Sequence, residues 1–260
     1  MTTRAISAFT VTRIAAGGSF LIGTQTVTAN AFSWMTSPTT DRLTLFGGAN
    51  FYSGANFRAA NIPAITSTIR IAAAAGTATN RTDGRQSLTA GSATNWAGAS
   101  IGIGRTTTTN STLANVGEVI IYPTELTPAS RNQVESYLAI KYGVTLDQTI
   151  ATNYTLSSGS IIWNATSAGV WKNNIAGIAR DDISTLSQLR SQSVTSTGDI
   201  IVSKASIGTN RMALMWANDG ASIATFTGTD APTGYQRMVR EWLFQEKNGD
   251  LATVNISYPA

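Results

Sequence analysis

The sequence predicts an all-β fold: an antiparallel β-sandwich of the jelly-roll type, closed by one short helix and followed by a second β-rich, sandwich-like domain. Three observations lead to this prediction. Short apolar runs recur along the whole chain of 260 residues, glycine-rich turn sequences separate them, and helical periodicity is confined to one stretch. Short strands at such spacing are typical of sandwiches and jelly rolls.

The first part of the chain reads as successive short strands. Strands are expected at residues 5–12, 19–22, 31–35, 43–46, 68–73 and 99–103. Turn signals separate them, among them Gly17-Gly18 and Asp83-Gly84. A hairpin turn at Asp83-Gly84 needs positive φ at both central residues, which aspartate and glycine tolerate.

Residues 117–148 are the most informative stretch, because a strand and a helix follow each other with clear end signals. Val119, Ile120 and Ile121 form a β-branched run bounded by Gly117 and Pro123, which is typical of a sheet interior. This run therefore predicts a buried strand.

A helix is expected at 128–142. Thr127 can act as N-cap, Pro128 suits the first helical position, and Gly143 suits the left-handed C-cap. The apolar face at four-residue spacing consists of Val134, Leu138 and Tyr142, with Tyr137 beside them.

This strand–helix segment resembles the closing segment of the concanavalin A-like, laminin-G-like sandwich modules of large bacterial surface proteins. The matching residues are Gly117, Glu118, Val119, Ile120, Ile121 and Tyr122, then Val134, Glu135, Tyr137, Leu138, Ala139, Lys141, Tyr142 and Gly143. The family often has a glutamate where this chain has Ser130, so we expect the reciprocal capping-box hydrogen bond to be missing. The resemblance implies a lectin-like sandwich over residues 1–147 that lacks its first strands.

A second domain is expected over residues 148–260. Its strand candidates are residues 160–163, 175–178, 199–203, 212–216, 240–244 and 252–258. This half resembles the uncharacterised β-rich domain that often follows the lectin-like module, through IIWNAT, NNIAGIARDD, LSQLRSQSV, MWANDG, RMVREWLFQE and GDLATVNISY. Ala179 replaces a glycine that is usual in this family. Because the last predicted strand has no evident partner, we expect the domain to be C-terminally incomplete.

Composition argues against catalysis. The chain has no cysteine and no histidine, which excludes disulfides, thiolate or imidazole metal sites, and Ser–His–Asp or Cys–His catalysis. The paired carboxylates of lectin-like glucanases are absent, and Glu118 stands alone on its predicted strand. We therefore expect a protein that is not an enzyme.

Charge gives a weaker signal about partners. The net charge is +4, and residues 1–110 carry eight arginines against two aspartates, scattered singly. A solvated surface is one interpretation, and a basic face for anionic polysaccharide or a nucleic acid is the other. Zinc spacing, basic helices and nucleic-acid-binding aromatic motifs are missing, so no nucleic-acid partner is expected. No apolar run approaches about 18 residues, so no membrane insertion is expected.

Calcium is the cofactor that the residue types allow. Asp181-Asp182 follows one predicted strand and Asn218-Asp219 follows another, so the two loops are candidates to converge on one ion with hard oxygen ligands. The same dipeptides are ordinary turn sequences, which is the alternative interpretation.

Tryptophans are the candidates for glycan binding. Trp163, Trp216 and Trp242 lie in apolar strand patterns and are expected in the core. Trp96 and Trp171 lie in loop-like contexts and are the glycan-binding candidates, with packing under a loop as the alternative.

Taken together, these features predict a non-enzymatic, extracellular module of a bacterial cell-surface protein of the adhesin type. It would bind a glycan or a surface protein, or build the cell-surface layer. The alternative is a structural subunit of an extracellular filament or sheath that self-assembles through open strand edges.

Overall fold

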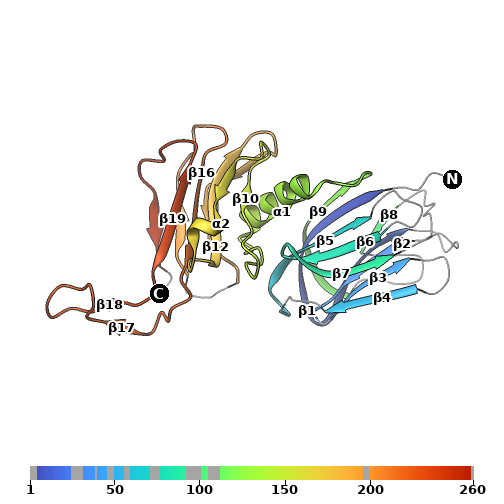
Figure 1. Ribbon diagram of the computed structural model, residues 1–260, viewed down its shortest axis with the longest axis horizontal. Helices are drawn as coiled ribbons and strands as arrows, with labels where there is room; N and C mark the ends of the chain where they lie inside the picture. Colours follow the sequence, from blue (N-terminus) through green and yellow to red (C-terminus); the bar gives the residue numbers. More distant parts are fainter. Residues whose placement is uncertain are drawn as a thin grey trace. The chain divides into compact units, whose positions relative to one another are not determined.

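The computed structural model describes residues 5–24, 32–38, 40–45, 50–55, 59–70, 77–91, 101–104, 112–195 and 199–258. By contacts, the chain divides into two compact units, Met1–Arg131 and Asn132–Ala260. Both units consist mainly of antiparallel strands (Figure 1), so the all-β, antiparallel sandwich expected from the sequence is confirmed. Among the described residues, no helix is long and apolar enough to cross a membrane.

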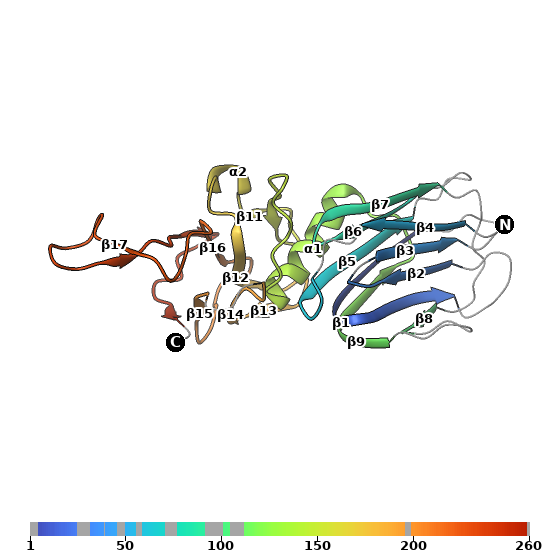
Figure 2. The same ribbon diagram turned by 90° about the horizontal axis from the view of Figure 1, so that it is seen from below.

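The first unit is a sandwich whose two layers share one long strand. Its strands are β1 (Ile6–Thr24), β2 (Phe32–Thr36), β3 (Thr40–Leu45), β4 (Asn50–Ala55), β5 (Pro63–Arg70), β6 (Thr77–Thr82), β7 (Arg85–Gly91), β8 (Ile101–Ile103) and β9 (Thr112–Tyr122). The first part of β1 pairs with β5 and β9, and its last part pairs with β2 and β8. Figure 2 shows these strands side by side.

Side chains from both layers of the first unit meet in one buried cluster. Ile6 and Ile14 come from the first part of β1, Ile22 from its last part, and Trp34 and Ala78 from β2 and β6. Burying such side chains stabilises the fold by about 1.5–3 kcal/mol for each large aliphatic residue. The shared core is what joins the two layers.

Two sequence expectations for β1 and β9 are wrong. The Gly17-Gly18 turn is absent, because β1 continues through Gly17, whose φ is +75°, with a register shift between Ile14 and Ser19. Among the described strands, β9 pairs with β1 alone, so it is an edge strand, and its side chains are half-buried or exposed. The β-branched run therefore predicted the strand correctly, but its predicted place in the interior of the sheet was wrong.

The Asp83-Gly84 turn is confirmed. Asp83 and Gly84 both have positive φ, +47° and +79°, at the turn between β6 and β7. The Asp83 Oδ1 also accepts a hydrogen bond from the Ile65 backbone N–H at 2.7 Å. Arg70, expected on the solvated surface, is instead fully buried at the end of β5.

The helix α1 (Pro128–Tyr142) has the predicted bounds. The Ser130 N–H donates to the Thr127 Oγ1 at 3.1 Å, and the Val144 N–H donates to the Ala139 carbonyl at 3.0 Å beyond Gly143. The second bond is the Schellman pattern, which satisfies a carbonyl at the helix end. From the predicted apolar face only Leu138 is buried, with Glu135, Ser136, Ala139 and Ile140.

The second unit holds most of α1 and, among the described strands, four small sheets. Ser136 Oγ accepts a hydrogen bond from the Thr155 N–H at 3.0 Å, and Asn132 Nδ2 donates to the Asn153 carbonyl at 3.0 Å. By contacts the chain thus divides within the first turn of α1. The domain bounds 1–147 and 148–260 stay a prediction about folding units.

The strands of the second unit form a sandwich-like pair of layers with a common core. One sheet has the order β13 (Leu186–Gln188), β12 (Asn173–Asp181), β16 (Ala213–Asn218), β19 (Trp242–Lys247), and the other has the order β14 (Arg190–Ser191), β15 (Ile201–Ser203), β20 (Asn255–Ser257). Shorter elements are β10 (Tyr154–Thr155), β11 (Ile161–Trp163), α2 (Ala165–Ala168), β17 (Phe226–Thr227) and β18 (Arg237–Met238).

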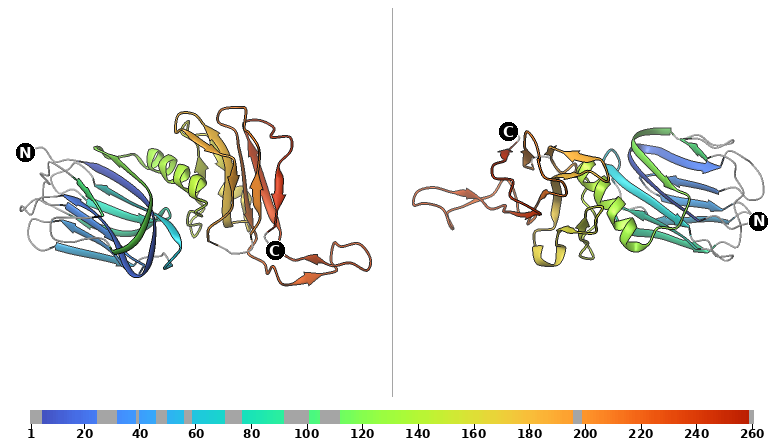
Figure 3. Two further views of the ribbon diagram at one scale, coloured as in Figure 1. Left: turned by 180° about the vertical axis from the view of Figure 1, so that it is seen from behind. Right: turned by 90° about the horizontal axis from the view of Figure 1, so that it is seen from above.

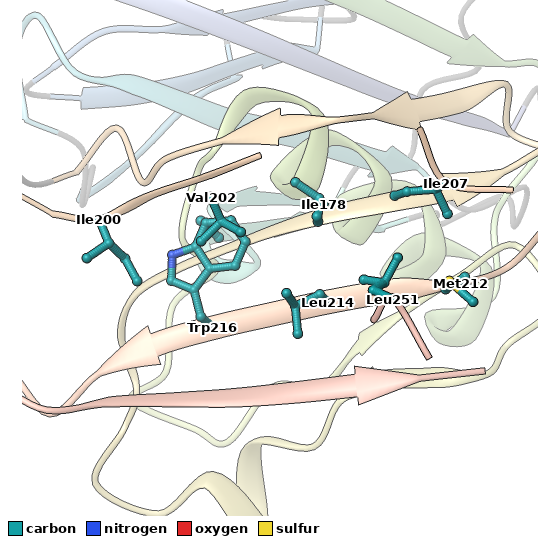
Figure 4. Packing of buried hydrophobic residues seen from close by; sticks show 9 residues of the cluster. Ile178, Ile200, Val202, Ile207, Met212, Leu214, Trp216 and Leu251 are labelled. Atoms are coloured by element: carbon teal, nitrogen blue, oxygen red, sulfur yellow. The ribbon is translucent and has the colours of Figure 1, made fainter. Parts of the chain in front are cut away.

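Figure 4 shows the core between these two sheets. Ile178 and Trp216 come from β12 and β16, and Val202 lies beside the Trp216 ring from β15. Trp163 and Trp216 are fully buried, as expected. Trp242 is half-buried and packs against the same core.

Candidate functional site

A hairpin stands out from the sheets of the second unit. We call residues 221–240 the arm; it contains β17 and β18 and lies apart from the sheets in Figures 1 and 3. At its base, the Arg240 Nε donates to the Ala221 carbonyl at 2.8 Å, and the Val239 N–H donates to the Thr225 carbonyl at 3.1 Å. These bonds hold the two ends of the arm together.

Asp219 fixes the arm to the sheet. Its Oδ1 accepts hydrogen bonds from the Ala221 N–H at 3.0 Å and the Glu241 N–H at 3.3 Å, while its own N–H donates to the Glu241 carbonyl at 3.2 Å. A carboxylate that accepts from both sides of a hairpin base is a structural clamp. The arm therefore leaves the sheet in a defined direction.

Arg237 braces the middle of the arm. Its Nε donates to the Thr229 carbonyl at 3.1 Å, and its guanidinium lies 3.0 Å from the Glu241 carboxylate and 3.7 Å from that of Asp230. Because these ion pairs are partly solvated, each contributes little on its own, about 0–1 kcal/mol. Together with the backbone bonds, they order a segment that lacks a core of its own.

The arm exposes two aromatic side chains. Tyr235 is 71% exposed and Phe226 is 55% exposed. Large aromatic groups on a braced hairpin, beside arginine, aspartate and threonine side chains, combine apolar contact area with hydrogen-bonding groups. This combination suits the face of a sugar ring or an apolar side chain of a protein partner.

The structure brings three of the predicted site residues to the end of the sheet that carries the arm. Asn173 pairs with Asn218 in the β12–β16 register, and Asn218 pairs with Trp242 at the start of β19. Trp171 precedes Asn173, and Asp219 follows Asn218. We call this edge the arm end. It places Trp171, Asn218 and Asp219 next to the base of the arm.

Asp181 and Asp182 lie at the opposite end of the same sheet. β12 is 9 residues long and runs antiparallel to β16, so the two predicted calcium loops are roughly 25 Å apart. The expected convergence of these loops is therefore wrong. Among the described residues, no group of three or more Asp and Glu side chains is placed to hold a metal ion.

Each of these polar groups has a structural partner. Asp181 is buried and accepts from the Ser157 N–H and Oγ, both at 2.7 Å. Asn218 is buried; its Nδ2 donates to the Asp199 Oδ2 at 3.0 Å, and its Oδ1 accepts from the Gly220 N–H at 2.9 Å. Such bonding agrees with the turn interpretation of these sequences.

Of the two glycan-binding candidates, Trp171 lies among the described residues and Trp96 does not. Trp171 is half-buried, and its Nε1 is enclosed without a hydrogen-bond partner. Its ring is thus partly enclosed, and Trp171 itself lies in the loop between α2 and β12. Trp96 lies outside the described residues. The sequence does not single out Tyr235 and Phe226, because they lie in a Thr/Gly/Pro-rich segment around residues 225–235 that has no strand periodicity.

Asp182 gives a prediction for the pH dependence of stability. Arg180 donates to both Asp182 carboxylate oxygens, at 2.7 and 3.0 Å, and this hydrogen bonding lowers the pKa of Asp182. A carboxyl with a lowered pKa stabilises the fold above its unfolded pKa, and this contribution is lost as the pH falls through the folded value. Asp182→Asn should thus lower the free energy of unfolding slightly at neutral pH, with no difference from the wild type in acid.

Urea unfolding of both proteins across the acidic range measures this difference. Asp230→Asn is the matched control, because the Asp230 side chain is 80% exposed and lies farther, 3.7 Å, from its arginine. A difference between wild type and Asp182→Asn that stays constant from neutral to acid pH would contradict the assignment.

Comparisons with known proteins gave one family model and several distant solved structures. A family model described as Domain of unknown function (DUF8202) matches residues 130–260. No curated protein matches the chain. Among solved structures, a heptameric SAP-like pentraxin from Limulus polyphemus shares 12% identity with a TM-score of 0.39, over 53% of this chain and 73% of the pentraxin.

Receptor-binding domains of botulinum neurotoxins are also similar. That of the C/D mosaic serotype has 12% identity and a TM-score of 0.43, over 95% of this chain and 65% of the domain. The serotype D ligand-binding domain, in complex with N-acetylneuraminic acid, has 11% identity and a TM-score of 0.42, over 96% and 65%. The chain thus spans slightly less than two thirds of these toxin domains. At such scores, the likeness carries no argument about what the chain binds.

Proposed function

The chain belongs to the family described as Domain of unknown function (DUF8202), and from this premise we propose that it is a non-enzymatic, extracellular binding module of a bacterial cell-surface protein. Its first unit is a sandwich of the concanavalin A-like, laminin-G-like kind, and its ligand is a glycan or a surface protein. The binding surface is the arm of the second unit, residues 221–240.

One observation supports this proposal above the others: Tyr235 and Phe226 are 71% and 55% exposed on a hairpin that is braced by hydrogen bonds and ion pairs. Exposed aromatics on an ordered hairpin lose little conformational entropy on binding, because their position is already set. A glycan fits this surface well, since sugar rings stack on aromatic faces while Asp230, Arg237 and the arm threonines supply hydrogen bonds.

The lack of catalytic chemistry agrees with a binding role. The sequence has no histidine or cysteine. The acidic residues of the second unit that lie near the arm, Asp219 and Glu241, bond the hairpin base and Arg237. The low charge content, 12%, is also common in secreted all-β proteins.

Aromatic truncation tests the arm directly. The double variant Phe226→Ala/Tyr235→Ala should weaken ligand binding by roughly tenfold or more, because aromatic anchors commonly dominate a binding surface. A glycan array probed with the 260-residue chain identifies the ligand, and isothermal titration then compares the variants. A pull-down with bacterial surface proteins covers the protein-ligand case.

The matched control is Ile183→Ala. Ile183 is 67% exposed but lies in the turn after β12, at the opposite end of the sheet from the arm. Its truncation should leave binding unchanged. Equal affinity in the wild type and the double arm variant would show that the ligand binds elsewhere.

A structural subunit of a filament or sheath is the second candidate function. The observation that favours it is that β19 and β20 each lie at the edge of a sheet among the described strands of the second unit. Open edges are where chains add to one another.

A further inference from the structure

The sandwich of the second unit is closed on one side and open on the other. On the closed side, β13 and β14 follow each other in the chain, so residues 186–191 pass from one sheet to the other. Leu186 and Ser191 in this crossing segment are buried. On the other side, β19 and β20 are both edge strands, each paired on one side only among the described strands.

Core side chains are exposed along the open side. Phe244 on β19 is directly opposite Trp216, and their rings lie 6.3 Å apart. Ile256 on β20 is directly opposite Val202. Residues opposite each other in an antiparallel pair project to the same face, so Phe244 and Ile256 project toward the core, as Trp216 and Val202 do.

The exposure of these side chains shows that the core is uncovered there. Trp216 and Val202 are 0% exposed, whereas Phe244 is 37% and Ile256 is 54% exposed. We call the strip formed by Phe244, Ile256 and the free backbone edges of β19 and β20 the open seam. An apolar strip beside two unpaired edges is a template for strand addition.

We propose that the open seam binds a second copy of this chain about a twofold axis, with β19 pairing antiparallel to the partner's β19 around Phe244. An isologous contact of this kind is self-complementary, which is the commonest arrangement in homodimers. Both sheets then continue into the second copy. Phe244 packs on its symmetry mate, and the two free edges are removed.

Charge complementarity favours a second copy of this chain as the partner and sets the register in which the two β19 strands pair. Pairing around Phe244 places Glu241 opposite Lys247 of the other copy, and the twofold axis repeats this ion pair. Lys247 is exposed and has no ion pair among the described residues, whereas Glu241 contacts Arg237 through one oxygen. Opposite charges across an antiparallel pair stabilise it, and like charges destabilise it.

The same twofold axis also suits the sheet that contains β20. Trp216 and Val202 lie side by side in the core (Figure 4), so Phe244 and Ile256, their cross-strand neighbours, lie on the same stretch of the seam. A twofold axis through Phe244 thus brings Ile256 next to its own mate. A single symmetry operation covers both exposed core side chains.

Single cysteines in this cysteine-free chain give a direct test. At Phe244→Cys the two thiols meet on the axis, where Cα atoms of paired strands are about 4.5–5.5 Å apart, within reach of a disulfide. Mild oxidation of the full chain should convert most of this variant to a covalent dimer. Ser187→Cys, an exposed strand position on the closed side, is the control and should remain monomeric in a denaturing gel.

Charge reversal tests the register without touching the core. Light scattering should find a dimer for the wild type, and Glu241→Lys or Lys247→Glu should each raise its dissociation constant about tenfold, because two like-charge contacts replace two ion pairs. The double variant Glu241→Lys/Lys247→Glu should restore the dimer. This readout needs no ligand, so it is independent of the proposed binding function.

Each outcome of these experiments either supports or overturns the proposed dimer. A dimer that is weakened by each single reversal and restored by the double variant supports the proposal. A wild type that stays monomeric into the millimolar range overturns it. So does a dimer indifferent to both reversals, equal cross-linking at Ser187→Cys, or growth into open polymers rather than closed pairs.

Discussion

Asp199→Ala is expected to lower the free energy of unfolding of the second unit by about 2–5 kcal/mol, because it leaves three hydrogen-bond donors without an acceptor. Asp199 is fully buried beside the core. Its Oδ1 accepts from the Trp242 Nε1 at 2.7 Å and the Ile200 N–H at 2.9 Å, and its Oδ2 accepts from the Asn218 Nδ2 at 3.0 Å. These bonds connect β16 and β19 to the segment that begins β15.

Urea unfolding followed by tryptophan fluorescence measures this loss, since Trp242 is itself one of the donors. Asp199→Asn keeps the side-chain volume and one acceptor oxygen. With that oxygen in place of Oδ1, it still accepts from the Trp242 Nε1 and the Ile200 N–H, and its NH₂ group meets only the Asn218 amide. It should therefore destabilise less than alanine. Asp230→Ala, at a side chain that is 80% exposed, serves as the surface control. An Asp199→Ala variant within about 0.5 kcal/mol of wild type would contradict the buried network.

Gly143→Ala is expected to destabilise the second unit by more than about 2 kcal/mol, because two separate costs add. The φ of Gly143 is +66°, a left-handed conformation that costs an alanine about 1–2 kcal/mol. A Cβ at this position would also lie 2.2 Å from the Gln192 carbonyl oxygen, so the backbone around Gln192 must move. The same segment also donates a hydrogen bond, from the Val194 N–H to the Gly143 carbonyl at 2.9 Å.

Gly159→Ala is the matched control for this substitution. Gly159 has a φ of +81°, but a Cβ there would meet only the Gln133 Nε2, at an ordinary 3.7 Å. Gly159→Ala carries the conformational cost without the clash. The melting temperature should therefore be highest for the wild type, lower for Gly159→Ala and lowest for Gly143→Ala. Equal stability losses for the two variants would show that the close approach to Gln192 is not a constraint.

Local signals explain which elements could be predicted from the sequence. The helix at 128–142 has an N-cap, a proline at the first position and a C-cap glycine, all within one short segment. The Asp83-Gly84 turn likewise depends on two adjacent residues. The crossing strand at 186–191 was missed because serine, glutamine and arginine fill it, and its burial comes from its place in the sandwich rather than from its composition.

The candidate site could be predicted only in part, because strand register is a long-range property. Trp171, Asn218 and Asp219 meet at the arm end since Asn173 pairs with Asn218, which is 45 residues away. The same register carries Asp181 and Asp182 to the opposite end. A sequence shows that both dipeptides follow strands, but it does not show that the strands run antiparallel.

The ordered conformation of the arm depends on tertiary contacts that no local sequence pattern predicts. β17 and β18 are each two residues long, and the segment between them reads as an ordinary Thr/Gly/Pro loop. Its order comes from Asp219, Arg237 and Arg240, which bond across the hairpin base and middle. The exposed aromatic side chains of this loop can be recognised as binding candidates only when these tertiary contacts are known.

Hydroxyl-radical footprinting of the full chain, with and without the glycan or protein identified as its ligand, tests the central claim most directly. Tyr235 and Phe226 are exposed and reactive aromatic side chains, so oxidation at both should fall strongly when the ligand binds. Ile183, at the opposite end of the sheet, should react equally in both states. Protection confined to side chains outside the arm, with Tyr235 and Phe226 still fully oxidised, would contradict the assignment of the arm as the binding surface.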